Sequence, residues 1–413
     1  MCGITGYLGP GDAGRIVYDG LANLEYRGYD SAGIALTGDS ITIQKTSGDV
    51  GTLSTPTRDD CTAGIGHTRW STHGEPTEQN AHPHTDCTDD IAVVHNGIIE
   101  NYDALKAELR DAHVFQSDTD TEVIPHLIES HLSDDVSLVT AVQRTTNQLN
   151  GSYAIAVTAA GHEGVVVARY DSPLLIGHDD DATYIGSDAT AFIEHTNRVT
   201  YLESGDIAHL TPGEVTIYAD GNRVERETET LDWDAEAAGK SGYDHYMLKE
   251  IHEQPRALRQ TISGRINELE TTVSLDVDLP TEYLRSIDEI QIIACGTSYH
   301  AGLYAKTLLE THADIRVSVH VASEYEFEGG RDPWRTLVIA ITQSGETADT
   351  LSALRKATRA GARTLAITNT LGSTVTRDAD DTLFIRPGPE IGVAATKTFS
   401  SQVATVALFT GFL

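Results

Sequence analysis

Apolar and polar residues follow two different patterns along this chain, and the pattern changes near residue 240. In the first part, short apolar runs bounded by turn residues predict β-strands at 41–43, 91–95, 153–158, 165–168 and 215–218. Amphipathic spacing predicts helices over residues 14–24 and 120–131, the second capped by Asp118 or Asp120. We therefore expect mostly antiparallel sheets layered against helices.

The second part alternates continuous apolar runs with helical segments. The runs cover residues 290–294, 317–321, 336–341, 364–367 and 382–385, with helical spacing at 299–311 and 347–360. Continuous apolar strands are typical of a parallel sheet covered on both faces. This predicts a doubly wound α/β domain that binds ligands at the carboxyl ends of its strands.

The two parts are joined by a polar, aperiodic stretch at residues 231–242. A helical segment follows it, and we expect Pro255 to interrupt this helix or start it afresh. The run from residue 399 to 413 is apolar and predicts a buried helix.

Composition agrees with a globular chain of two domains. At 413 residues the chain is too long for one ordinary core, and no apolar stretch approaches the ~18 residues of a membrane span. The N-terminus lacks a basic segment followed by an apolar one, so we expect a cytoplasmic protein. The four cysteines form no CxxC pair, which favours reduced thiols over a disulfide framework.

The net charge of −33 is spread along the whole chain. Such a surface repels itself at low ionic strength and is tolerated when salt screens it, so we interpret it as halophilic adaptation. An acidic face for a basic partner is the alternative, and it would be localised. The same charge disfavours nucleic-acid binding.

The first candidate for chemistry is Cys2. Removal of Met1 would place a thiol and a free α-amine on one residue, with ordinary pKa values near ~8.5 and ~8. The amine could then take the thiol's proton during attack on a carbonyl. The apolar run at residues 4–9 predicts a strand that holds this end of the chain, and a buried structural cysteine is the alternative.

Polar residues also follow two strand-like runs, at 67–74 and 95–97. The guanidinium of Arg69 suits a substrate carboxylate. The amide of Asn96 and the backbone N–H of Gly97 could hold the oxyanion that forms when a thiol attacks a carbonyl.

A zinc site is the alternative interpretation of this region, because His82, His84 and Cys87 lie nearby. No pair among them has a standard ligand spacing on a recognisable helix or knuckle. We therefore expect no metal.

Two hydroxyl-rich turns follow strands in the second part. Residues 342–347 and 295–298 each combine Gly with Ser or Thr just before a predicted helix. Free N–H groups at a helix N-terminus bind phosphate well. Because Gly-Lys-Ser/Thr is missing, a phosphorylated metabolite is favoured over a nucleotide.

Several of these segments together carry a resemblance to a known family. They are residues 1–4, 25–33, 67–70, 95–97, 119–122, 245–247, 295–298, 343–347 and 390–394. The chain resembles the glutamine–fructose-6-phosphate aminotransferase (isomerizing) family over almost its whole length. This implies an αββα glutaminase domain with an N-terminal nucleophile at 2–230, a linker with connecting helices at 231–284, and a doubly wound sugar-isomerase domain at 285–413.

The resemblance also implies roles for individual residues. Cys2 would be the nucleophile, with Asn96 and Gly97 as the oxyanion hole. Glutamine would be bound by Arg69, Trp70, His73 and Asp120, with Trp70 gating the release of ammonia. The sugar phosphate would be bound by Thr297, Ser298, Thr342, Gln343, Ser344, Thr347 and Val393. Glutamine and fructose 6-phosphate would be the substrates, with no cofactor, no membrane partner, and a homodimer as the assembly.

The chain departs from the family pattern in three ways. Thr342 stands where Ser is common, Ala395 stands where a sugar-contacting Ser is usual, and a second isomerase module with its acid–base residues is absent. We therefore expect a fragment, or a product needing a complementary chain, that hydrolyses glutamine but makes no glucosamine 6-phosphate alone. A glutaminase-only fragment and a non-enzymatic sugar-phosphate sensor are the alternatives.

Two other enzymes with such a glutaminase domain are rivals. An amidophosphoribosyltransferase would need an Asp-Asp-Ser/Thr loop after a strand, and an asparagine synthetase a Ser-Gly-Gly-x-Asp loop. We find neither loop after a predicted strand of this chain.

Overall fold

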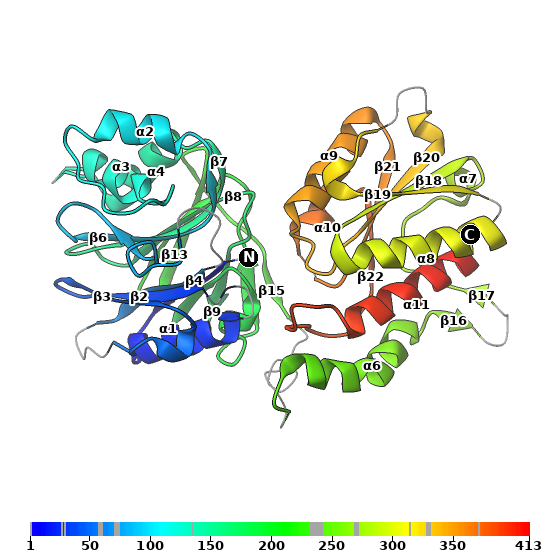
Figure 1. The fold of residues 1–413 in the computed structure, drawn as a ribbon, viewed down its shortest axis with the longest axis horizontal. Helices are drawn as coiled ribbons and strands as arrows, with labels where there is room; N and C mark the ends of the chain where they lie inside the picture. The colour runs from blue at the N-terminus through cyan, green and yellow to red at the C-terminus, as the bar shows by residue number, and fades with distance from the viewer. Residues whose placement is uncertain are drawn as a thin grey trace. The chain divides into compact units, whose positions relative to one another are not determined.

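The computed structural model describes the chain except residues 1, 26–27, 29, 57–60, 70–74, 134, 232–242, 268–271, 314, 328–331 and 371. The chain divides into two compact units, Met1–Ala235 (unit 1) and Glu236–Leu413 (unit 2). Each unit has its own sheets and its own buried core (Figure 1). None of the described helices is both long and apolar enough to cross a bilayer.

Unit 1 is built on two antiparallel sheets. The eight-stranded sheet has the order β15-β11-β9-β10-β1-β4-β2-β3, and the seven-stranded sheet has the order β14-β13-β12-β8-β7-β6-β5. Their strands are β1 (Gly3–Leu8), β2 (Ser31–Thr37), β3 (Ile41–Ser47), β4 (Ala63–Arg69), β5 (His84–Thr85), β6 (Ile91–Ile99), β7 (Gly151–Ala159), β8 (Val165–Tyr170), β9 (Leu175–His178), β10 (Thr183–Gly186), β11 (Arg198–Tyr201), β12 (Ile207–Thr211), β13 (Glu214–Ala219), β14 (Asn222–Val224) and β15 (Thr228–Thr230). The helices of this unit are α1 (Ala13–Leu24), α2 (Tyr102–Leu109), α3 (Val123–His131) and α4 (Leu138–Thr146) among the described residues.

The two sheets face each other and are covered by helices on their outer sides. Ile4, Ile65 and Val94 belong to the apolar core between the sheets, as the alternation of side chains along a strand requires. The helices α2, α3 and α4 cover the other face of the smaller sheet, where Leu127 packs with Val93 in one buried cluster. Helix α1 contacts β1, β2 and β4. The predicted αββα layering is therefore confirmed.

Helix α3 begins three residues later than the sequence predicted. The expected cap, Asp120, does not cap the helix, because its carboxylate Oδ2 accepts a hydrogen bond from the backbone N–H of Ile99 at 2.7 Å. The N-cap position is occupied by Glu122 instead. Asp120 is therefore not the helix cap, and its carboxylate is hydrogen-bonded to the backbone at the end of β6.

Unit 2 contains a parallel sheet of five strands in the order β19-β18-β20-β21-β22. Its elements are α6 (Tyr246–Ile262), β16 (Ile266–Asn267), β17 (Thr272–Val273), α7 (Thr281–Leu284), β18 (Glu289–Ala294), α8 (Gly296–His312), β19 (Arg316–Val321), β20 (Thr336–Ile341), α9 (Ala348–Ala360), β21 (Arg363–Thr368), α10 (Thr374–Asp378), β22 (Asp381–Phe384) and α11 (Lys397–Phe412). The chain runs outward from β18 to β19 and then returns to β20 on its other side, so the direction of winding reverses between β18 and β20.

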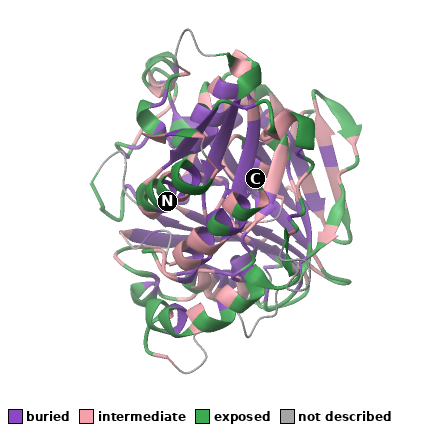
Figure 2. Ribbon diagram, turned by 90° about the vertical axis from the view of Figure 1, so that its right-hand side faces the viewer, coloured by how far each residue is buried: buried purple, intermediate pink, exposed green. Residues whose placement is uncertain are grey.

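Helices cover both faces of this sheet. Leu309 of α8 and Phe409 of α11 pack on one face, and Leu354 of α9 packs on the other. The central strands β18, β20 and β21 are buried, whereas the edge strands β19 and β22 are partly exposed. Figure 2 colours buried residues purple and exposed ones green. The predicted doubly wound α/β domain is confirmed.

Helix α6 runs through Pro255 without a break, contrary to the sequence prediction. Proline has no N–H to donate to the carbonyl of Ile251, four residues earlier. That carbonyl instead accepts a hydrogen bond from the side-chain Nε2 of Gln254 at 3.2 Å. The neighbouring amide therefore replaces the missing hydrogen bond, and the helix continues.

Candidate active site

Cys2 lies immediately before β1, a central strand of the larger sheet. Its neighbour Gly3 pairs with Thr68 of β4, so Cys2 lies at the strand end next to Arg69. The backbone carbonyl of Cys2 accepts a hydrogen bond from Asn96 Nδ2 at 3.1 Å, and the residue is partly exposed. Pairing on both sides of β1 thus fixes this end of the chain within the fold.

The side chain of Asn96 connects the two sheets at this point. Its Oδ1 lies 3.0 Å from Nε2 of His67, which is on β4 of the other sheet. Burial lowers the pKa of His67 to about 3, so the ring is neutral, and its Nε2–H must be the donor because an amide oxygen only accepts. His67 therefore orients the amide so that its NH₂ group faces Cys2.

Gly97 follows Asn96 in a backbone conformation that requires glycine. Its φ is 134°, and a Cβ atom there would lie 2.0 Å from the backbone oxygen of Ser152. Any side chain at this position would displace β7 from β6. The residue type is thus dictated by the close approach of the two strands.

Arg69 and Asp120 add one positive and one negative group beside the thiol. Both side chains are almost fully buried. Burial lowers the pKa of the Arg69 guanidinium, and the nearby Cys2, Asp120 and Asp30 oppose that shift. A buried cation and a buried anion at one site match the two charged groups of an α-amino acid.

The structure thus brings Cys2, Arg69, Asn96, Gly97 and Asp120 together from β1, β4, β6 and the segment before α3. The predicted residues Trp70 and His73 lie outside the described residues.

Three further histidines surround this site, and sequence reasoning assigned them no role in it. The ring of His82 stacks on His67 with centroids 4.1 Å apart, and its Nδ1 accepts a hydrogen bond from the backbone N–H of His95 at 3.2 Å. His95 Nδ1 lies 2.8 Å from Thr121 Oγ1, and His84 Nε2 lies 3.0 Å from Thr119 Oγ1. Only His95 has a signal in the sequence, because it ends the apolar run at 91–95; His82 and His84 have no such signal.

In unit 2, both predicted phosphate-binding turns lie at the carboxyl ends of neighbouring strands. Ala294, the last residue of β18, pairs with Ile341, the last residue of β20. The turn at 342–347 therefore lies next to the start of α8, at the point where the winding of the sheet reverses. This is the predicted position for a ligand.

The hydroxyl groups of these turns have different partners. Thr342 Oγ1 accepts a hydrogen bond from the N–H of Gly345 at 3.2 Å, so it shapes the turn. Ser344 Oγ accepts from the N–H of Glu346 at 3.2 Å. Ser298 Oγ accepts from Gln402 Nε2 at 2.9 Å and is nearly buried. Thr347 is the N-cap residue of α9.

The other predicted sugar-phosphate residues lie at the same end of unit 2. Thr297 is in the first turn of α8 and Gln343 is in the turn after β20; both are partly exposed. Val393 is 76% exposed and follows Gly392, whose N–H donates to Glu250 Oε1 at 2.9 Å. Glu250 on α6 therefore holds the backbone beside Val393.

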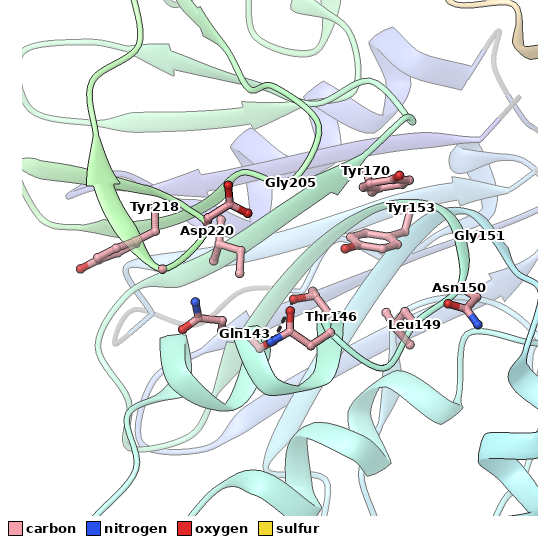
Figure 3. A pocket seen from close by; sticks show the side chains of 13 residues that line it. Gln143, Thr146, Leu149, Asn150, Gly151, Tyr153, Tyr170, Gly205, Tyr218 and Asp220 are labelled. Carbon is pink, nitrogen blue, oxygen red and sulfur yellow. Dashed lines mark hydrogen bonds between the residues drawn. The ribbon is translucent and has the colours of Figure 1, made fainter. Parts of the chain in front are cut away.

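A separate cavity of about 380 Å³ lies in unit 1 between α4 and strands β7, β8, β12 and β13 (Figure 3). Tyr153 and Tyr170 stack along one side with ring centroids 5.9 Å apart, and burial raises the pKa of Tyr153 to about 12. Its lining includes Asp220 but no cationic side chain. The cavity shares no residue with the Cys2 site, and its lining offers an amino-acid carboxylate no cationic partner.

Comparison with known proteins defines the class of this chain. Residues 67–194 match the glutamine amidotransferase domain family, and residues 283–410 match the SIS domain family. The fold is thus that of an N-terminal-nucleophile glutamine amidotransferase joined to a doubly wound SIS domain.

Full-length relatives identify the family. Over 411 residues the chain is 74% identical to the glutamine–fructose-6-phosphate aminotransferase [isomerizing] of Halobacterium salinarum, and over 416 residues it is 48% identical to that of Symbiobacterium thermophilum. Each alignment covers 99% of this chain and 68% of the relative. The chain therefore belongs to the glutamine–fructose-6-phosphate aminotransferase (isomerizing) family. The halophilic adaptation that its acidic composition indicates agrees with a relative from Halobacterium.

A solved structure gives a partial match. The C-terminal domain of glucosamine-fructose-6-phosphate aminotransferase from Francisella tularensis is 42% identical, covering 42% of this chain and 48% of that chain at a TM-score of 0.39.

The buried histidines predict a stability that falls with acid. Burial holds the pKa of His67 at about 3 and those of His82, His84 and His95 below their usual range. These histidines stay neutral when folded but take protons near ~6.5 when unfolded, so stability is lost as pH falls below about 6.5. We expect the melting temperature in molar salt to be roughly 5–10 °C lower at pH 5.5 than at pH 7.5.

This pH range lies above the usual pKa values of Asp and Glu, so histidines dominate the change. Equal melting temperatures at pH 7.5 and pH 5.5 would show that the four rings are not held neutral.

Proposed function

We propose that this chain hydrolyses glutamine at Cys2 to glutamate and supplies the ammonia to fructose 6-phosphate, and that forming glucosamine 6-phosphate also needs residues from the part of the relatives beyond the aligned region. The observation that carries the proposal is the Asn96 amide, which is fixed by His67 and faces Cys2. Limits of 2–230 for the glutaminase domain and 285–413 for the sugar-isomerase domain belong to the same proposal.

In the proposed first step, the α-amine of Cys2, free after removal of Met1, accepts the thiol proton. The sulfur attacks the side-chain amide carbon of glutamine, and the carbonyl oxygen becomes an oxyanion. The NH₂ of Asn96 and the N–H of Gly97 stabilise this charge. Collapse of the intermediate returns the proton to the leaving nitrogen, releasing ammonia and a thioester, which water then hydrolyses to glutamate.

Recognition of glutamine follows from the charges beside the thiol. Arg69 would bind the α-carboxylate of glutamine and Asp120 its α-ammonium. Their near-complete burial supports these roles, because charges that pair away from water are screened less than exposed ones. Trp70, as the gate for ammonia, and His73, at the carboxylate, remain proposals from family resemblance.

Fructose 6-phosphate would bind at the carboxyl edge of the parallel sheet in unit 2. Ser298, Gln343, Ser344 and Thr347 would hold its phosphate, aided by the N-terminus of α9, with Thr297, Thr342 and Val393 close by. The relatives extend beyond the aligned region, and we propose that isomerisation uses acid–base residues from such a region. We further propose a homodimer in the cytoplasm, without a cofactor and with no nucleic-acid or membrane partner.

The oriented amide predicts a specific kinetic defect. Asn96→Ala should lower kcat for glutamine hydrolysis about 100- to 1000-fold, because one oxyanion donor is lost. His67→Ala should also lower kcat, whereas His67→Gln, which keeps an N–H donor for Asn96 Oδ1, should retain more activity. Wild-type kcat in Asn96→Ala would contradict the oxyanion role.

Of the four cysteines, only Cys2 is expected to act as the nucleophile. Cys2→Ala should abolish glutamate release from glutamine, while the matched variants Cys61→Ala and Cys295→Ala should retain it. Mass analysis of the active protein should find Met1 removed. An active preparation that still carries Met1 would eliminate the α-amine as base.

The sugar-phosphate prediction uses thermal stability. Fructose 6-phosphate should raise the melting temperature of the chain, because a ligand that binds only the folded state stabilises it. The double variant Ser344→Ala/Thr347→Ala should lose most of that shift. Unphosphorylated fructose is the control, and an equal shift with it would disprove phosphate recognition.

A further inference from the structure

A second group of reactive side chains in unit 1 shares no residue with the Cys2 site. Cys87 lies in the turn between β5 and β6, His113 follows α2, and His126 and Glu129 lie on α3. The three-residue spacing of His126 and Glu129 puts both on one face of the helix. One ligand atom from each of the four residues lies within 4.8 Å of the others.

The distances between these atoms have the pattern of a tetrahedral metal centre. Cys87 Sγ lies 3.6 Å from His113 Nδ1 and 3.6 Å from His126 Nδ1. Glu129 Oε2 lies 3.4 Å from His126 Nδ1 and 2.8 Å from His113 Nδ1. A tetrahedral zinc ion with ordinary bond lengths needs ligand atoms about 3.3–3.6 Å apart. Three of these four separations fall in that range, and the fourth is shorter.

We propose that Cys87, His113, His126 and Glu129 bind one Zn²⁺ ion. A thiolate with two imidazoles selects zinc over Mg²⁺ and Ca²⁺, which prefer oxygen ligands. The thiolate and the carboxylate together balance the two charges of the ion. Cys87 is exposed and Glu129 is partly exposed, so the ion has a path from solvent.

The surroundings of His126 support this assignment. Its side chain is 1% exposed, and its Nε2, the nitrogen pointing away from the cluster, has no hydrogen-bond partner among the described residues. The carboxylate Oε1 of Glu122 lies 3.8 Å from that nitrogen. A metal-bound histidine commonly donates its outer N–H to a carboxylate, and Glu122 is the carboxylate on that side of the ring, in ion contact at 3.8 Å rather than in a hydrogen bond.

A hydrogen-bonded cluster without metal explains the geometry less well. Glu129 Oε2 would have to accept from the backbone N–H of Cys87 at 3.3 Å and from both imidazoles. Both histidines direct Nδ1, rather than their outer nitrogens, toward the same thiol. Convergence of four donor atoms on one point is the arrangement that a metal ion produces.

Four protein ligands would leave no open coordination position, so the ion would be structural. It would join the β5–β6 turn, the segment after α2, and α3. Glu122, beside His126, also accepts hydrogen bonds from the N–H groups of Gln116 and Ser117. The ion would therefore stabilise the segment that carries Asp120 to the Cys2 site.

Metal analysis of the whole chain tests this assignment. The wild-type protein, purified without a metal-affinity tag and dialysed in molar salt with reductant, should contain about one zinc per chain by plasma mass spectrometry. Cys87→Ser and His126→Ala should lose it. Cys2→Ala, Cys61→Ser and Cys295→Ser are matched controls that should keep it.

Two further measurements keep the test decisive if a variant fails to fold. Replacement of zinc by Co²⁺ in the wild type should give the visible bands of tetrahedral cobalt and a thiolate charge-transfer band, both absent in Cys87→Ser. A strong chelator should lower the wild-type melting temperature. The proposal is overturned if the wild type neither contains nor takes up zinc, or if Cys87→Ser keeps a full equivalent.

Discussion

The amide of Asn96 is the contact on which the rest of the site depends. It accepts a hydrogen bond from His67 on one sheet, donates to the carbonyl of Cys2 at the end of β1, and leads into Gly97 on the other sheet. The neutral state of His67, enforced by burial, decides which way the amide points. A single hydrogen-bonded link thus couples the packing of the two sheets to the position of the thiol.

Much of the fold could be predicted from periodicity. The continuous apolar runs of unit 2 gave its parallel strands, and the two hydroxyl-rich turns lie where its winding reverses. Two predictions about helices were wrong, and each error has a local cause that the hydrophobic periodicity does not reveal. Helix α6 continues through Pro255 because Gln254 supplies the missing hydrogen bond, and α3 starts late because Asp120 is bound by Ile99. Both depend on side-chain contacts rather than on pattern.

Short sequence motifs allowed part of the candidate site to be predicted. The part that depends on tertiary contacts could not be predicted from the sequence. Cys2, Asn96 and Gly97 follow from motif chemistry, whereas the orienting role of His67 requires the second sheet. From the sequence we considered Cys87, His82 and His84 together as zinc ligands and therefore expected no metal. The structure instead places Cys87 with His113, His126 and Glu129, and only the spacing of the last two was visible in the sequence.

The central claim is that Cys2 is the nucleophile of a glutamine-hydrolysing site. It is tested most directly by treating the chain with a diazoketone analogue of glutamine, which alkylates an activated thiol, and mapping the product by peptide mass spectrometry. We predict one adduct per chain, on Cys2 of a peptide without Met1, with excess glutamine protecting it. An adduct on Cys61, Cys87 or Cys295, or none that glutamine prevents, would contradict the account.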